Sequence, residues 1–223
     1  RLTCTRSYAT VSFRRLAIAC GDAGIGKTQA CRQYYREHGT NCIYITVNPC
    51  IKSSKSVLEL IGSKLNVSSG SVSRLWLEIS SKLSDGMVII VDEAQHLTRN
   101  AIDTLRSLCD CFDEKGQTLG ICFVGNETTV SRLGGKQKAE FAQIRNRTKN
   151  TRFYSVKQIK KSDIEMLFPD IREDTAAVEF LLCIAQSPQA IRGAVNLYSN
   201  ALDNGNVTAK GLSAIAKYMD MAV

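Results

Sequence analysis

The sequence lacks the long apolar runs and targeting signals that would place a protein in a membrane or a secretory pathway. No apolar run in its 223 residues approaches the length of a membrane-spanning helix. No basic stretch followed by an apolar stretch resembles a signal peptide. We therefore expect a soluble, cytoplasmic protein with no membrane partner. The sequence begins at Arg1 rather than Met, which leaves open a missing N-terminal segment.

The spacing of a zinc site is also absent. The nine cysteines form no C-x-x-C pair, and the two histidines, His38 and His96, lie far apart. This pattern argues against bound zinc and favours small, reduced thiols in the core. Basic residues outnumber acidic ones by 29 to 21, which gives a formal net charge of +8. Such a charge is compatible with a polyanionic partner such as nucleic acid, and equally with an ordinary basic protein.

A glycine-rich motif is the most informative stretch of the sequence. It matches G-x-x-x-x-G-K-[ST], follows an apolar run at residues 16–20 and precedes a helix-compatible segment at residues 28–37. The backbone N–H groups of such a loop point at phosphates, and the N-terminus of the helix adds a partial positive charge. Lys27 is expected to reach the β- and γ-phosphates, and the Thr28 hydroxyl to hold Mg²⁺. The predicted nucleotide-binding residues are Gly21, Asp22, Ala23, Gly24, Ile25, Gly26, Lys27 and Thr28.

A second apolar run, residues 87–91, leads directly into Asp92 and Glu93. Ligands of open α/β sheets bind at the carboxyl ends of the strands. We therefore expect Asp92 to hold the Mg²⁺ and Glu93 to polarise the attacking water. Another apolar run at residues 119–124 precedes Asn126, a candidate for contacting the γ-phosphate, although Asn in a loop is more often a turn residue. Together with the glycine-rich loop, these residues predict hydrolysis of a nucleotide rather than binding alone.

The order of apolar segments predicts an α/β fold with a five-stranded parallel sheet flanked by helices. The strands are expected at residues 16–20, 42–47, 87–91, 119–124 and 152–156. From about residue 157 the pattern is helical only. A capping box at Ser162–Glu165 predicts the start of one helix, and Ser187–Pro188 predicts the start of another. We predict a nucleotide-binding domain over residues 1–156 and a small helical lid over residues 157–223.

Taken in order, these motifs resemble those of the AAA+ ATPases, and within them the transposition ATPases of the phage Mu B, TnsC and TniB type. The resemblance rests on GDAGIGKT, VIIVDEAQHL, FVGN, GGKQKAEFAQIRNR and SPQAIR, and it extends over nearly all of the chain. This sequence departs from the pattern in one respect, because full-length relatives of the Mu B type carry an N-terminal helix-turn-helix region and we expect none here. The resemblance implies the AAA+ form of the P-loop NTPase fold.

The resemblance also implies roles for further residues. Asn126 matches sensor 1, and Arg192 matches sensor 2, which touches the γ-phosphate from the lid. Arg147 falls where the family places an arginine finger that reaches the nucleotide of a neighbouring subunit, and Arg145 and Arg152 are alternatives. The implied cofactors are ATP and Mg²⁺. The implied partners are double-stranded DNA, bound largely without sequence specificity, further copies of the chain in a helical filament, and a transposase.

Basic loop residues are the candidates for DNA contacts. They are Lys52, Lys55, Arg99, Lys136 and Lys138. The first two follow the second predicted strand, Arg99 follows the acidic motif, and the last two form an alternative site. An ordinary solvated charge explains each residue nearly as well when it is taken singly.

Two other interpretations remain open. An AAA+ loader or a secretion-type ATPase also carries a DEAQ-type acidic motif, and it would bind DNA weakly. A nucleotide-gated scaffold would bind ATP and DNA with slow hydrolysis, and the presence of Glu93, Asn126 and Arg147 argues against it.

Overall fold

The computed structural model of the chain describes residues 16–129 and 150–221. These residues form two compact units. The first, called here the sheet unit, consists of residues 16–20, 27–129 and 150–153. The second, called the helical unit, consists of residues 21–26 and 154–221. The predicted domain boundary after residue 156 stays a prediction.

Five strands form one sheet. Their bounds are β1 Leu16–Gly21, β2 Cys42–Thr46, β3 Met87–Asp92, β4 Leu119–Gly125 and β5 Asn150–Tyr154. They lie in the order β2-β3-β4-β1-β5, and the pairs β2/β3, β3/β4 and β4/β1 are parallel. The predicted five-stranded parallel sheet is confirmed, although β5 lies two residues earlier than expected.

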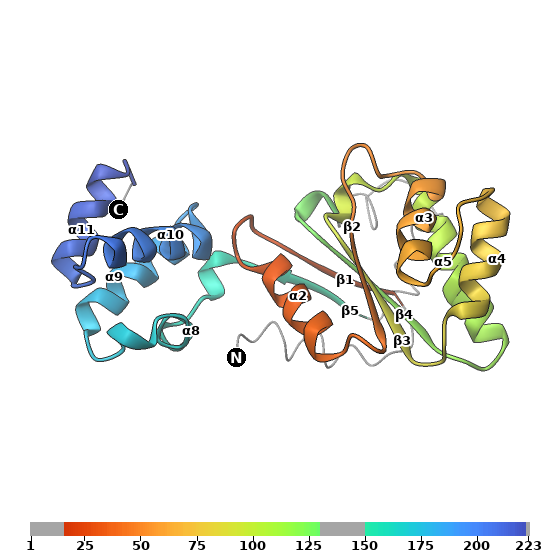
Figure 1. Cartoon of the computed structure of the whole chain (residues 1–223). Helices are drawn as coiled ribbons and strands as arrows, with labels where there is room; N and C mark the ends of the chain where they lie inside the picture. Colours follow the sequence, from red (N-terminus) through yellow and green to blue (C-terminus); the bar gives the residue numbers. More distant parts are fainter. Residues whose placement is uncertain (1–15, 130–149, 222–223) are drawn as a thin grey trace. The chain divides into compact units, whose positions relative to one another are not determined.

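Helices cover both faces of this sheet. They are α2 Lys27–Glu37, α3 Ser54–Lys64, α4 Val72–Lys82, α5 Arg99–Glu114 and the short 3-10 helix η1 Ala94–His96. Figure 1 shows α3, α4 and α5 grouped together, with α2 apart from them. Side chains alternate between the two faces along β3, so Ile89 and Val91 share one core with α3, α4 and α5. On the other face, Cys42 and Cys122 lie near Tyr34 of α2.

The larger core lies beneath α5. Ile102, Leu105, Leu108 and Phe112 recur at helical spacing along one face of α5, and each is at most 3% exposed. The helix begins where the Thr98 hydroxyl accepts a hydrogen bond from the backbone N–H of Ala101, at 3.3 Å. The core therefore fixes the position of α5. Because α5 begins at Arg99, it also restrains the short segment that joins it to the end of β3 at Asp92.

The helical unit contains four α-helices and two short 3-10 helices among its described residues (Figure 1). They are η2 Val156–Gln158, α8 Lys161–Leu167, η3 Pro169–Ile171, α9 Thr175–Gln186, α10 Ala190–Asp203 and α11 Ala209–Tyr218. Their buried faces form a second core around Leu181, Ile184 and Leu197. The helical C-terminal part is thus confirmed. Among the helices of residues 16–129 and 150–221, none combines the length and apolar character needed to cross a bilayer.

Two predicted helix starts are wrong by two residues. Helix α10 begins later than predicted, because Ser187 closes α9 instead, and its hydroxyl donates to the carbonyl of Ile184 at 2.7 Å. Helix α8 begins earlier than predicted, because its N-cap is Lys160 rather than Ser162, and the carboxylate of Asp163 accepts the N–H of Lys160 at 2.8 Å. Short polar side chains can bond forward or backward along the chain, and the sequence alone does not decide between the two.

Candidate functional site

The predicted phosphate loop, residues 21–26, lies within the helical unit. Gly24 and Gly26 have φ angles of 75° and 95°, which residues with a side chain rarely adopt. The carbonyl of Gly24 accepts a hydrogen bond from the backbone N–H of Arg192 at 3.1 Å. The structure therefore brings the first turn of α10, where Arg192 is exposed, next to this loop.

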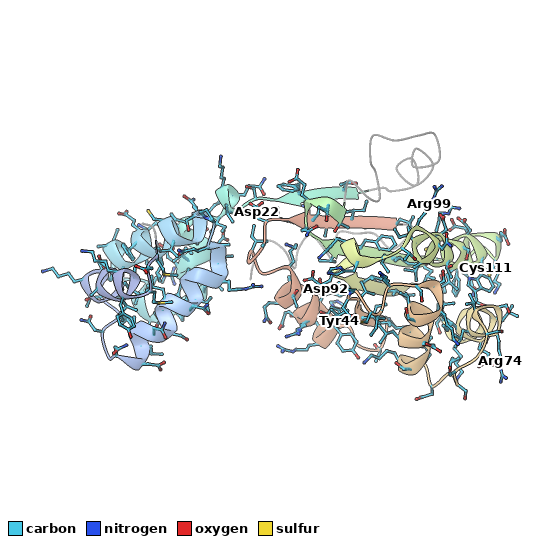
Figure 2. All side chains as sticks on the ribbon, turned by 90° about the horizontal axis from the view of Figure 1, so that it is seen from above. Asp22, Tyr44, Arg74, Asp92, Arg99 and Cys111 are labelled. Atoms are coloured by element: carbon cyan, nitrogen blue, oxygen red, sulfur yellow. The ribbon has the colours of Figure 1, made fainter. Side chains whose placement is uncertain are left out.

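Asp22 anchors the start of the same loop (Figure 2). Its backbone N–H donates to the carbonyl of Tyr154 at 3.0 Å, and its carboxylate accepts the N–H of Val156 at 2.8 Å. A Cβ at Gly21 would overlap the same Tyr154 carbonyl, so only glycine fits at that position. The sequence placed Asp22 in the phosphate loop but did not indicate this anchoring contact.

The carboxylate of Asp92 is the centre of a polar cluster in the sheet unit (Figure 2). It is 1% exposed. Its Oδ2 accepts hydrogen bonds from the Thr28 hydroxyl at 2.8 Å and from the Tyr44 phenol at 2.9 Å, and its Oδ1 accepts the N–H of Glu93 at 2.9 Å. The structure thus brings together the two predicted magnesium ligands, Thr28 and Asp92, from α2 and β3.

Tyr44 is a residue of this cluster that the sequence analysis missed. It lies on β2, next to β3 in the sheet. Burial raises the pKa of its phenol to about 12, and the nearby carboxylate of Asp92 adds to the increase. The phenol is therefore a hydrogen-bond donor throughout the neutral pH range. Only the adjacency of β2 and β3, and not any local motif, could have indicated this contact.

Thr28 and Asp92 fit a magnesium site by their chemistry. Mg²⁺ prefers oxygen ligands and is held in many proteins by one or two carboxylates, with phosphate oxygens and water completing its shell. Among residues 16–129 and 150–221, no three His, Cys, Asp or Glu side chains gather at one point. A metal at Asp92 would therefore depend on phosphate and water for most of its ligands.

Glu93 and Asn126 approach each other through Gln95. The side-chain amide of Gln95 donates to the carboxylate of Glu93. Its carbonyl oxygen accepts the N–H of Asn126 at 3.4 Å and the hydroxyl of Thr129 at 3.3 Å. The two residues predicted at the ends of β3 and β4 thus lie around one glutamine that the sequence analysis did not single out.

Asn126 also makes a local turn contact. Its amide oxygen accepts the N–H of Thr128 at 3.0 Å, as Asn often does in turns. Its role at a phosphate stays a prediction.

Three candidate DNA-binding residues, Lys52, Lys55 and Arg99, are exposed on the sheet unit. The carbonyl of Lys52 accepts hydrogen bonds from the N–H and the hydroxyl of Thr98, at 3.0 and 3.1 Å, so Lys52 and Arg99 belong to neighbouring segments. Lys55 and Arg99 each pair loosely with an acidic residue one turn along the same helix, at 4.0 and 3.9 Å. Such exposed pairs hold their basic groups weakly.

Four predicted residues lie outside the described residues, namely Lys136, Lys138, Arg145 and Arg147. Arg152, an alternative for the arginine finger, lies on β5 and is exposed. The choice among these arginines stays a prediction.

Comparison with known proteins identifies the family. The model of a family described as "AAA domain" matches residues 12–133, more than half of the chain. The chain belongs to the AAA domain family. Solved structures similar to this chain include the Aeropyrum pernix Orc1 protein in complex with DNA, with a TM-score of 0.66 and 15% identity over 97% of this chain and 64% of that chain. The Thermotoga maritima RuvB Holliday junction branch migration motor is also similar, with a TM-score of 0.56 and 19% identity over 97% of this chain and 65% of that chain. At these identities the likeness shows the fold alone, and it confirms the predicted AAA+ fold.

Two relatives of the chain come from a phage and a prophage. The chain is 30% identical over 204 residues to the ATP-dependent target DNA activator B of Escherichia phage Mu, a match that covers 88% of this chain and 61% of the relative. It is 28% identical over 211 residues to the Mu-like prophage FluMu DNA transposition protein B of Haemophilus influenzae, a match that covers 88% of this chain and 70% of that relative. The predicted resemblance to transposition-type AAA+ proteins is confirmed. The chain spans less than two thirds of the length of the phage Mu relative.

Proposed function

We propose that this protein is an ATP-dependent regulator of DNA transposition. It binds and hydrolyses ATP with Mg²⁺, assembles on double-stranded DNA largely without sequence preference, and selects the target at which it recruits or stimulates a transposase. The names of its phage and prophage relatives support this proposal. The observation that carries its ATPase part is the 2.8 Å contact between the Thr28 hydroxyl and the buried carboxylate of Asp92. This pairing of the phosphate-loop hydroxyl with an acidic strand end is typical of Mg²⁺-dependent NTPases.

In the proposed site, the N–H groups of residues 21–26 bind the phosphates, and Lys27 neutralises the β- and γ-phosphates. Thr28 and Asp92 hold Mg²⁺, which supplies charge stabilisation to the phosphate oxygens when bound. Glu93 accepts a proton from the attacking water.

Three further residues complete the proposed site. Asn126 acts as sensor 1, and Arg192 acts as sensor 2 at the γ-phosphate. Arg147 of a neighbouring subunit offsets the charge that develops on the transferred phosphoryl group, and such a finger can accelerate hydrolysis by about 10³-fold or more. Turnover should therefore rise with protein concentration and with DNA, because both promote assembly.

ATP hydrolysis with and without double-stranded DNA tests the proposal. Wild-type protein should hydrolyse ATP faster on DNA, and Glu93→Gln should retain ATP binding while losing turnover by about 10²-fold or more. Electron microscopy of protein and DNA should show filaments in ATP that are lost in ADP. A Glu93→Gln protein with normal turnover would refute the catalytic assignment. Rings or monomers that do not bind DNA would favour an AAA+ loader.

A mixing experiment tests the shared site. Arg147→Ala and Lys27→Ala subunits are defective on opposite sides of the proposed interface, so their mixture should recover part of the activity that each lacks alone. A mixture that co-assembles and stays inactive would exclude Arg147 and direct attention to Arg145 or Arg152.

We also propose that Lys52, Lys55 and Arg99 contact DNA phosphates. The bonds from Thr98 to the carbonyl of Lys52 support this, because they join the loop after β2 to the start of α5 and so bring the basic positions of both into one region. All three side chains are exposed to solvent.

The salt dependence of DNA binding distinguishes the surface of Lys52, Lys55 and Arg99 from the alternative site at Lys136 and Lys138. The double variant Lys52→Ala/Lys55→Ala should reduce the slope of log affinity against log salt concentration by about two units. The double variant Lys210→Ala/Lys217→Ala removes the same charge from exposed positions of α11 and should leave the slope unchanged. If the two double variants behave alike, the DNA site lies elsewhere, with Lys136 and Lys138 as the next candidates.

A further inference from the structure

Gln95 connects the ends of two neighbouring strands, β3 and β4. Its Nε2 donates to Oε2 of Glu93, and its Oε1 accepts the N–H of Asn126 at 3.4 Å and the Thr129 hydroxyl at 3.3 Å. The partners determine the orientation of the amide, because a backbone N–H can only donate and an ionised carboxylate can only accept. The amide nitrogen of Gln95 therefore binds Glu93, and its amide oxygen binds the residues that follow β4.

The surroundings of Gln95 are shaped to admit it. A Cβ at Gly125 would overlap both the Oε1 of Gln95 and the Oγ1 of Thr129, so the glycine that ends β4 makes room for the contact. Thr129 is completely buried, and a buried hydroxyl requires a hydrogen-bond partner. The glutamine supplies one, which fixes its side chain against the tip of β4.

Glu93 adopts a conformation that other contacts must stabilise. Its φ of 58° and ψ of 33° lie in the left-handed region, which costs free energy for a residue with a side chain and occurs often at functional sites. The carbonyl of Glu93 accepts the N–H of His96 at 3.0 Å, which closes the turn, and Gln95 binds the carboxylate. Backbone and side chain of Glu93 are thus both held within the same short segment.

We propose that Gln95 is a positioning residue for the catalytic carboxylate. It orients Glu93 toward the attacking water and keeps that carboxylate at a fixed place relative to the β4 tip that carries Asn126. Gln95 itself does not touch the substrate and acts through Glu93. This inference rests on the proposed ATPase function, in which Glu93 is the general base.

The variant Gln95→Glu separates positioning from structural support. Its carboxylate retains the two acceptor roles at the β4 tip, so the fold is preserved, but it cannot donate to Glu93 and repels it. We expect kcat to fall about tenfold or more, with the KM for ATP and the melting temperature near those of the wild type. Gln33→Glu is the matched control, because Gln33 also donates to a glutamate, Glu37, at 2.8 Å, but on the exposed surface of α2. It should have wild-type kcat.

A double-mutant cycle then tests whether Gln95 acts through Glu93. In the Glu93→Gln background, Gln95→Glu should cause no further loss of the residual rate, because the carboxylate that it positions is absent. Wild-type kcat in Gln95→Glu, or an equal fold loss in both backgrounds, would overturn the inference. The proposed function fails by a different result, namely a Glu93→Gln protein that hydrolyses ATP normally.

Discussion

Replacing Tyr44 by Phe removes one hydroxyl from the cluster around Asp92 and keeps the aromatic ring. The phenol donates to Oδ2 of Asp92 at 2.9 Å, and this carboxylate is 1% exposed, so water has little access to replace the lost donor. A hydrogen bond to a charged group contributes about 1.5–3 kcal/mol. We therefore expect the free energy of unfolding to fall by about 2 kcal/mol in the absence of nucleotide and metal.

Urea unfolding followed by circular dichroism measures this loss. The midpoint should decrease with an unchanged m-value, and the melting temperature should fall by about 4–8 °C for a chain of this size. Tyr35→Phe is the control, because the Tyr35 ring is 37% exposed and lies 6.2 Å from the Tyr44 ring. It removes the same atom from the surface and should change stability by less than about 0.5 kcal/mol. If both variants lose equal stability, the Tyr44 phenol does not stabilise the carboxylate and the reasoning is refuted.

Three further predictions concern the thiols and the core of the sheet unit. Burial raises the pKa of the Cys109 thiol from 9.0 to about 12, so the stability that the protonated thiol contributes is complete below about pH 9 and lost as pH rises toward 12. Cys109→Ala should therefore make the free energy of unfolding fall less steeply between pH 9 and 12. An unchanged slope, measured by urea unfolding at several pH values, would contradict this. A thiol reagent at neutral pH should label the exposed Cys50 and Cys183 of the native protein before the buried thiols of the described residues, as mass spectrometry can determine. Leu105→Ala empties a position of α5 that is 0% exposed and should cost about 2–5 kcal/mol, whereas Leu202→Ala, at 56% exposed, should cost less than about 1 kcal/mol in the same assay.

The parts of the site that depend on local pattern could be predicted from the sequence. The apolar run at residues 87–91 indicates a buried strand whatever its neighbours are, and Asp92 directly after it must lie at the strand end. Tyr44 could not be predicted, because it reaches Asp92 only where β2 lies beside β3. The composition of β2 is compatible with any neighbouring strand.

Gln95 illustrates a second limit of local pattern. Its side chain reaches both Glu93 and the tip of β4 because the chain turns at Glu93 with a positive φ, a backbone angle that a glutamate adopts rarely. Ser187 shows the same limit at a helix end, since its hydroxyl could equally have opened α10 or closed α9. In both cases the local pattern is compatible with more than one arrangement.

The loop between β2 and α3 is held by atoms that do not belong to its basic side chains. The amide oxygen of Asn48 accepts the N–H groups of Cys50 and Ile51, both at 2.9 Å, and the bonds from Thr98 reach the backbone carbonyl of Lys52. Every amino acid carries such a carbonyl. Position 52 can therefore gain, lose or reverse its charge during evolution while the loop keeps its path, so that the attraction between this surface and a polyanion can drift independently of the fold.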